Sequence, residues 1–276
     1  MVHAGIYYPE NSLKAFHCVN GRRLLKQYCE DTGVAYLQRG KLIVATNNRQ
    51  ESVLTDILNK SRRNGLVSPD EALRLLSANE AKSIEKNIVC TAAILSPATA
   101  VVDSNMYLSQ LAADCEVLGV QFAYATEVNQ FSAMDSRVRV HTSQDTVSFD
   151  VVVNAAGLGS IALSSPVTSS VASVPYFAKG NYYKLVGANP FSHLVYPVPE
   201  RAGLGVHVTI DVHDQVRFGP DVQWLDILNQ DDIDYSVDPE RCSSFYAEIR
   251  KYWPDLKDGA LEPDYSGVRP KINNKG

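Results

Sequence analysis

The segment FDVVVNAAGLGS at residues 149–160 constrains the fold most, because an apolar run leads directly into a turn of small residues. The run predicts a buried strand. In the turn, Asn154, Ala155, Ala156 and Gly157 leave room for a ligand to approach the backbone, and glycine tolerates unusual dihedral angles. In doubly wound folds, ligands bind at the carboxyl ends of strands. The segment therefore indicates a nucleotide-binding turn, with an ordinary glycine turn after a buried strand as the alternative.

A second feature limits that interpretation. No GxGxxG motif follows a strand and opens a helix anywhere in the 276 residues. This motif cradles the pyrophosphate of a dinucleotide in βαβ units. The nearest candidate, Gly157-Leu158-Gly159, lacks the third glycine. The sequence therefore predicts that the chain by itself does not build a complete dinucleotide phosphate site.

The rest of the sequence mixes helical periodicity with strand-like runs. Between residues 174 and 222, alternating strand-like segments and turn signals are typical of an antiparallel sheet. We expect an α/β fold with an additional antiparallel β-sheet. The predicted helices are 12–31, 49–65, 70–76, 104–119 and 238–253, and the predicted strands are 41–46, 120–128, 137–141 and 265–272, with strand and turn at 90–103.

Composition excludes several classes of function. The formal net charge is −5 and no basic stripe is present, so a nucleic-acid interface is not expected. No apolar run approaches the roughly 18 to 20 residues that a membrane-spanning helix needs. The five cysteines form no CxxC pair and the six histidines show no HxxxH spacing, so no metal site is expected. An acidic substrate would need individual Arg or Lys residues to bind it.

Four polar side chains are candidates for chemistry. His3, next to small residues, suits proton transfer beside a flat cofactor, or is a structural histidine in a turn. Arg269, between glycine and proline in SGVRP, is suited to bind a carboxylate with two hydrogen bonds, or is a surface arginine. His207 lies in an alternating strand and is either functional or a cross-strand histidine. Lys179 is most simply a solvated lysine at a strand end.

Several motifs in this order resemble the D-amino-acid-oxidase-like family of FAD enzymes, and within it the L-2-hydroxyglutarate dehydrogenases. They cover most of the chain, and YPVPE, GLGVHVT, FGPD and GVRPK are specific to that subfamily, whereas VVNAAG is not. Ala100 stands where the subfamily usually has glycine. The matching stretches are VHAGIYYPENSLKAFHCVNGRRLL, GKLIVAT, LSPATAVVD, VVNAAGLG, FAKGNYYKL, LVYPVPERAGLGVHVTID, VRFGPDVQW, YSVDPER, FYAEIRKYWPDL and YSGVRPK.

The resemblance implies a fold and a set of cofactor contacts. The fold would be an incomplete FAD-binding domain with a ββα three-layer sheet (residues 1–30, 88–170 and 262–276). A substrate domain with an antiparallel sheet (31–87 and 171–261) would lie over the flavin. Val128, at the end of its strand, would contact the adenine side through its backbone. The remaining cofactor-binding residues would be His3, Ala4, Gly5 and Ile6 beside the flavin and pyrophosphate, and Asn154, Ala155, Ala156 and Gly157 along the cofactor.

The resemblance also implies an activity, the oxidation of L-2-hydroxyglutarate to 2-oxoglutarate by hydride transfer to FAD. His3 or His207 would be the base and Arg269 would bind the substrate carboxylate. The second carboxylate needs another cation, for which Lys179 and Lys271 are candidates. The electron acceptor stays open. The alternatives are a related FAD amine or amino-acid oxidase and a truncated remnant without catalytic activity.

In two places the sequence departs from the family pattern, because a segment that family members have is not present. Family members begin with a βαβ unit that carries the glycine-rich fingerprint and continue past GVRPK with a glycine-rich segment, neither of which is present here. We therefore expect a fragment that binds FAD weakly or not at all by itself. The resemblance to eukaryotic relatives implies a mitochondrial location, and a bacterial source would imply the cytoplasm.

Overall fold

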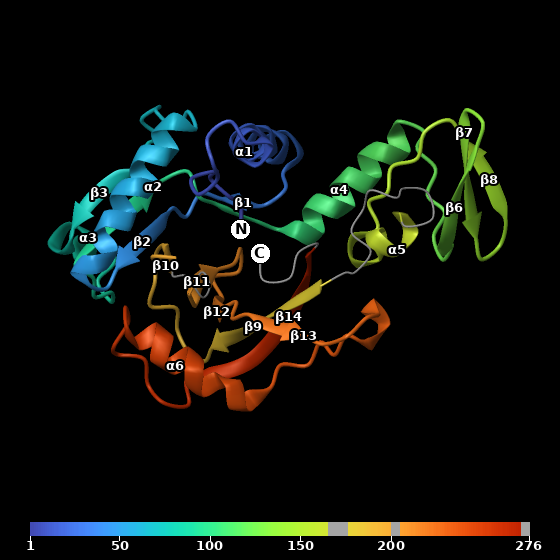
Figure 1. Cartoon of the computed structure of the whole chain (residues 1–276). Helices are drawn as coiled ribbons and strands as arrows, with labels where there is room; N and C mark the ends of the chain where they lie inside the picture. The colour runs from blue at the N-terminus through green and yellow to red at the C-terminus, as the bar shows by residue number, and fades with distance from the viewer. Residues whose placement is uncertain (165–175, 200–204, 272–276) are drawn as a thin grey trace. The chain divides into compact units, whose positions relative to one another are not determined.

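The computed structural model describes residues 1–164, 176–199 and 205–271 (Figure 1). The chain divides into two compact units. The first comprises Met1–Cys115, Asn181–Asp221 and Val237–Tyr265, and the second comprises Glu116–Gly180, Val222–Ser236 and Ser266–Gly276. These boundaries differ from those of the two predicted domains, which remain a prediction.

The helices begin and end where local signals place them. Ser12 Oγ accepts a hydrogen bond from the Ala15 N–H and caps α1, and Gly33 ends that helix with a positive φ of 76°. Asp103 Oδ1 accepts from the Met106 N–H and caps α4; the sequence offered Asp103 or Ser104 for this role. No helix in the described ranges has the length and apolar character needed to cross a membrane. The helices are α1 (Leu13–Thr32), α2 (Glu51–Arg63), α3 (Ala78–Ile84), α4 (Ser104–Val117), α5 (Ser160–Ser164) and α6 (Cys242–Arg250), with short 3-10 turns η1 (Asn48–Gln50), η2 (Gly157–Gly159), η3 (Gln230–Asp232) and η4 (Pro239–Arg241).

The strands form one large mixed sheet and two small ones. In the first unit the order is β9-β12-β11-β10-β2-β4-β3, and only the pairing of β10 with β2 is parallel. The strands are β1 (Tyr36–Leu37), β2 (Lys41–Ala45), β3 (Arg74–Ser77), β4 (Ala92–Ser96), β5 (Val101–Val102), β6 (Val128–Met134), β7 (Arg137–Thr142), β8 (Thr146–Phe149), β9 (Tyr176–Leu185), β10 (Leu194–Pro197), β11 (His207–Ile210), β12 (Val216–Gly219), β13 (Gln223–Leu225) and β14 (Leu261–Lys271).

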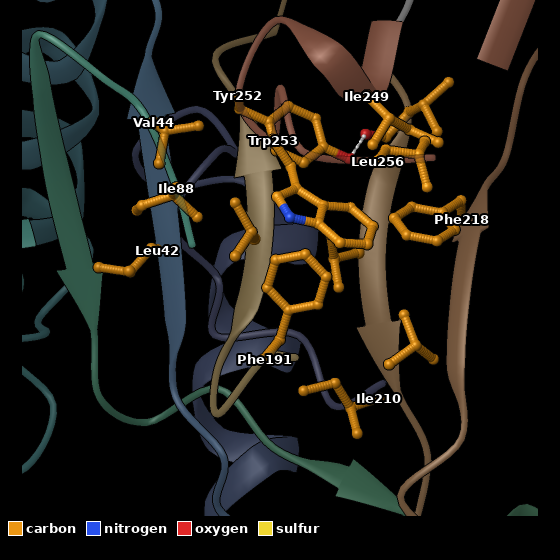
Figure 2. Close-up of a cluster of buried hydrophobic side chains, with 14 of the residues drawn as sticks. Leu42, Val44, Ile88, Phe191, Ile210, Phe218, Ile249, Tyr252, Trp253 and Leu256 are labelled. Carbon is orange, nitrogen blue, oxygen red and sulfur yellow. Dashed lines mark hydrogen bonds between the residues drawn. The ribbon is translucent and has the colours of Figure 1, made fainter. Parts of the chain in front are cut away.

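One face of this sheet carries the larger core of the first unit. Figure 2 shows its aliphatic and aromatic side chains, contributed by the strands and by α6 and the residues that follow it. Trp253 packs edge-on against Phe191, and the buried Tyr252 hydroxyl donates to the Val206 carbonyl at 2.9 Å. A buried phenol stabilises the fold only when its hydroxyl finds such a partner. The labelled members are Leu42, Val44, Ile88, Phe191, Ile210, Phe218, Ile249, Tyr252, Trp253 and Leu256.

The opposite face of the same sheet carries a different set of side chains, because side chains alternate along each strand. In β2, Ile43 and Ala45 point to a second buried cluster that contains Leu54 and Ile57 of α2. Lys41 shares this face with Ile43. The sheet thus has one face that carries the larger apolar core and a second face on which the charged Lys41 lies among apolar residues.

The second unit contains the antiparallel sheet β6-β7-β8, and the first part of β9 pairs with β13. Few of its side chains are buried; Phe131, Val140, Ile161 and Phe177 are the large apolar ones among its described residues. The described residues of this unit therefore bury few apolar side chains.

Three predicted elements are wrong. Residues 70–76 were expected to form a helix, but β3 pairs with β4 and buries Leu76 opposite Ala93, so tertiary pairing overrides helical periodicity. Residues 120–127 do not form a strand, and β6 begins at Val128.

The third wrong element is the apolar run before the glycine-rich turn. Residues 151–153 form no strand, and Val151 and Val153 are 79% and 83% exposed. A strand needs a hydrogen-bonding neighbour, and within the described ranges none pairs with this run. Apolar composition alone therefore did not determine the local structure.

Candidate functional site

His3 lies in a tightly held turn at the start of the chain. The Gly5 N–H donates to His3 Nδ1 at 2.9 Å, so the proton of the neutral imidazole resides on Nε2. Gly5 has a φ of +85°, and a Cβ there would lie 2.7 Å from Val19 Cγ2, so no other residue fits. Asn64, just after α2, donates to the carbonyls of Gly5 and Tyr8 and anchors the turn.

The protonation of His3 follows from its surroundings. Burial, and secondarily the charge of Lys41, lower the His3 pKa from 6.5 to about 4. The ring is therefore neutral at pH 7. Because Nδ1 already accepts a hydrogen bond, His3 can donate from Nε2 but offers no free acceptor nitrogen.

Lys41 opens β2 and is fully buried. Its Nζ lies 4.9 Å from the centroid of the Tyr7 ring and 4.6 Å from that of Tyr196. Within the described part of the chain, Nζ has no hydrogen-bond partner. Burial lowers the Lys41 pKa from 10.5 to about 7, since the charged form loses its hydration.

Tyr196 joins Lys41 to the second predicted histidine. In β10, Tyr196 stacks on His207 of β11 with ring centroids 3.6 Å apart and planes inclined by 11°. The Tyr196 hydroxyl donates to Met1 Sδ at 2.7 Å. His207 is 6% exposed. The stack fixes the orientation of the imidazole against the Tyr196 ring, which Lys41 also contacts.

These contacts bring both predicted histidines into one group, which we call the basic–aromatic cluster: His3, Tyr7, Lys41, Tyr196 and His207. The His3 and Tyr7 rings are 5.8 Å apart. Burial and the neighbouring Tyr196 raise the pKa of Tyr7 well above its usual value, so its hydroxyl stays protonated. At neutral pH the cluster therefore presents hydrogen-bond donors and a cationic group, which suits an anionic ligand.

Lys41 was not among the residues predicted from sequence. It was interpreted only as the first residue of the apolar strand KLIVAT. A usable signal was present, since a lysine within a strand buried on both faces is rare unless it is paired or functional.

The predicted cations in the second unit are placed differently. Lys179 is not solvated: it is 5% exposed, and its Nζ donates to the carbonyls of Asp234 and Ser236 at 2.6 Å each. These bonds occupy two of its three donors. Arg269 is exposed on β14, and Lys271 ends that strand half-buried. The structure thus gives Lys179 a structural role in its own unit.

The predicted cofactor turn also lies in the second unit. Asn154 Nδ2 donates to the Ser160 carbonyl and to Ser164 Oγ, and its Oδ1 accepts from the Ala156 N–H. Gly157 has a positive φ of 56°, as its place in the turn predicted, and Ala155 is exposed. Asn154 therefore closes the turn and holds it against α5.

Val128 is not at the end of its strand as predicted. It opens β6 and pairs with Thr142 of β7. Its predicted backbone contact with the adenine side of the cofactor remains a prediction.

Comparison with known proteins identifies the family. The model of the FAD dependent oxidoreductase family matches residues 1–276. The chain belongs to the FAD-dependent oxidoreductases. The family and the enzyme class predicted from the sequence motifs are confirmed, and FAD is the cofactor of this family.

Among curated relatives of this oxidoreductase, the mitochondrial L-2-hydroxyglutarate dehydrogenase of Arabidopsis thaliana is 38% identical over 99% of the chain and 64% of the relative. The L-2-hydroxyglutarate dehydrogenase of Indibacter alkaliphilus is 30% identical over 80% of the chain and 55% of the relative. The mitochondrial human enzyme is 31% identical over 80% of the chain and 50% of its own length. The chain thus spans less than two thirds of the length of these relatives.

Two solved structures of oxidoreductases share the fold. The dithionite-reduced L-α-glycerophosphate oxidase of Mycoplasma pneumoniae with FAD bound has a TM-score of 0.83 at 20% identity, covering 98% of this chain and 71% of that chain. Glycine oxidase of Geobacillus kaustophilus has a TM-score of 0.80 at 18% identity, covering 98% and 70%. These similarities confirm the predicted fold class.

Proposed function

We propose that the protein oxidises L-2-hydroxyglutarate to 2-oxoglutarate with FAD as the hydride acceptor. The similarity to the Arabidopsis L-2-hydroxyglutarate dehydrogenase, 38% over 99% of the chain, carries this proposal. The basic–aromatic cluster supports it independently, because a buried set of donors with one cation suits a carboxylate substrate.

The residues fit one part of an FAD site. The unpartnered Lys41 ammonium and the Nε2–H of His3 are donors of the kind that an electron-rich isoalloxazine ring or a carboxylate accepts. The Gly5 turn supplies a backbone that a side chain would obstruct. The sequence contains no GxGxxG fingerprint, so the fit concerns the flavin end and not the pyrophosphate.

The chemistry divides between the cofactor and this chain. When bound, FAD supplies the acceptor for the hydride that leaves carbon 2 of the acid. The chain must remove the hydroxyl proton and hold the substrate. Of the two histidines considered as the base, His207 is favoured, because His3 Nδ1 is engaged by Gly5 and Nε2 carries a proton. His3 then acts as a hydrogen-bond donor that holds an oxygen of the substrate.

Anaerobic flavin reduction tests the proposed reaction. Because we expect weak FAD binding, FAD is added to the full chain at a concentration high enough to occupy a weak site. The flavin absorbance is then followed after addition of L-2-hydroxyglutarate, its D-enantiomer, glycine or L-proline. We expect bleaching by L-2-hydroxyglutarate alone. Bleaching by an amino acid instead would assign the protein to the amine and amino-acid oxidases.

A pair of variants tests the assignment of the base. We expect His207→Asn to slow flavin reduction by roughly 100- to 10,000-fold, the usual contribution of a general base. His3→Gln retains a donor and should slow the reaction much less. The reverse order of effects would make His3 the base.

The relatives also bear on location. The Arabidopsis and human relatives are named mitochondrial, and the bacterial ones are not. We therefore propose a mitochondrial location in a eukaryotic source, which fluorescence microscopy of the tagged protein, expressed from its own gene, would check.

A further inference from the structure

Lys41 is the most unusual charged residue in the described part of the chain. Its side chain is fully buried, it is enclosed by the rings of Tyr7 and Tyr196, and its Nζ has no hydrogen-bond partner within the described ranges. Leaving a charged or polar group buried without a partner is costly, so native proteins rarely do so. This arrangement calls for an explanation that packing alone does not provide.

Among the described residues, the groups around Lys41 do not include a counter-ion. His3 and Tyr7 face it from the N-terminal segment, Tyr196 from β10, and His207 is stacked behind Tyr196 on β11. Met1 is also near this group, since its Sδ accepts from the Tyr196 hydroxyl, and burial lowers the pKa of its amino terminus. Burial is the one cause of the lowered Lys41 pKa, so no carboxylate of the described chain offsets it.

We propose that Lys41 is the carboxylate-binding group of the site, and that its amine takes up one proton from solvent when the acid binds. The inference rests on the proposed function for the identity of the acid, a 2-hydroxy dicarboxylate. The ligand supplies the missing negative charge, and the two tyrosine rings pack against its methylene groups. One carboxylate would thus be held by Lys41, a role for which the sequence suggested Lys179 or Lys271.

Three observations favour a carboxylate over other ligands. The cluster offers donors from Lys41 and His3, and the Tyr7 hydroxyl remains protonated, so an acceptor with several lone pairs fits it. Aromatic walls favour a short ligand with apolar carbons between its charged ends. Met1, whose Sδ accepts from Tyr196, is 46% exposed, so displacement of a flexible side chain uncovers the cluster without breaking the sheet.

The proton uptake follows from the change in surroundings. Without ligand, a lysine with a pKa near 7 is mostly neutral at pH 8. A bound carboxylate within contact distance raises the pKa again, because opposite charges favour the ionised form. Binding at pH 8 therefore consumes close to one proton per ligand, and binding at pH 6 consumes almost none.

Calorimetric titration of the full chain with glutarate, a dicarboxylate that cannot be oxidised at carbon 2, tests this inference without turnover. Titration at pH 8 in two buffers of different ionisation enthalpy counts the protons taken up. We expect uptake of close to one proton in the wild type. Lys41→Met should weaken binding by about 100-fold, as removal of a charged partner does. Lys41→Arg should retain binding within about 10-fold but show no uptake, because arginine stays charged.

Lys184→Met is the matched control, since Lys184 lies on the same sheet in an exposed pair with Glu262 and should leave binding and proton uptake unchanged. Uptake that persists in Lys41→Arg would locate the proton on another group, such as His207, and overturn the inference. Unchanged glutarate affinity in Lys41→Met would do the same.

The ligand series separates this inference from the proposed function. Glutarate binding without a contribution of Lys41 would refute the inference and leave the proposed substrate in place. Binding of glycine or L-proline in place of glutarate, with proton uptake that depends on Lys41, would refute the proposed substrate and retain the carboxylate-binding lysine. If none of these acids bound, both would be wrong.

Discussion

Two buried lysines in this chain have opposite environments. Lys179, in the second unit, is 5% exposed and donates to two backbone carbonyls. Lys41, in the first unit, is fully buried and has no hydrogen-bond partner in the described residues. A buried charge with partners holds a structure together, whereas one without partners is a liability unless a ligand completes it. The comparison teaches that burial alone does not distinguish a structural lysine from a functional one.

The largest expected effect on stability comes from removing the unpartnered lysine. Lys41→Met should raise the free energy of unfolding by about 5 kcal/mol at pH 6, because the pKa is lowered by roughly 3.5 units at about 1.4 kcal/mol each. Urea unfolding of both proteins without ligand measures the difference.

The effect of Lys41→Met on the free energy of unfolding should depend on pH. Between the folded pKa near 7 and the unfolded value of 10.5, the unfolded state binds more protons, so the stability of the wild type rises with pH in this window. The gain from Lys41→Met should therefore shrink as the pH rises from 7 to 10. A stabilising effect that is equal at pH 6 and pH 10, or a destabilisation at pH 6, would show that the ammonium has a partner.

The second prediction has the opposite sign. Lys179→Met should lower the free energy of unfolding by about 3 kcal/mol, because two buried hydrogen bonds to a charged donor are lost and the carbonyls of Asp234 and Ser236 lose their partner. The same urea titrations measure it. Stabilisation by this substitution would remove the distinction between the two lysines.

What the sequence allowed us to predict depends on whether the signal is local. Asp103, one of two candidate caps, and the turn glycine Gly157 were recognisable because their roles involve neighbours within a few residues. Strand β3 was not, since its identity comes from β4, which follows it in the chain.

In the candidate site too, only the residues with a local sequence signal were predicted. His3 and His207 were identified from short motifs, but Lys41 becomes distinctive only when strands β2 and β10 place it between Tyr7 and Tyr196. The sequence shows that a lysine begins an apolar strand, whereas the lack of a hydrogen-bond partner among the described residues is a property of the fold.

A third prediction concerns the histidine whose pKa Lys41 influences. The His3 pKa falls from 6.5 unfolded to about 4 folded, so the unfolded state binds more protons between these values and stability declines as the pH falls through this window. We expect a loss of about 3 kcal/mol from this group, since its pKa is lowered by roughly 2.5 units at about 1.4 kcal/mol each. His3→Gln cannot take up the proton and should lack this part of the acid destabilisation. Identical acid unfolding profiles for both proteins would mean that His3 already titrates near its unfolded value.

The smallest expected effect on stability comes from Lys184, which is exposed and lies outside the basic–aromatic cluster. Lys184 Nζ lies 3.2 Å from Glu262 Oε2, and the two side chains are 41% and 56% exposed. Exposed pairs gain little because water and salt screen them and because two long side chains lose conformational freedom. Lys184→Met should therefore change the free energy of unfolding by less than about 1 kcal/mol, measured in the same urea titrations. A larger change would mean that accessibility is a poor guide to which lysines matter in this sheet, and the contrast between Lys41 and Lys179 would then need a cause other than their partners.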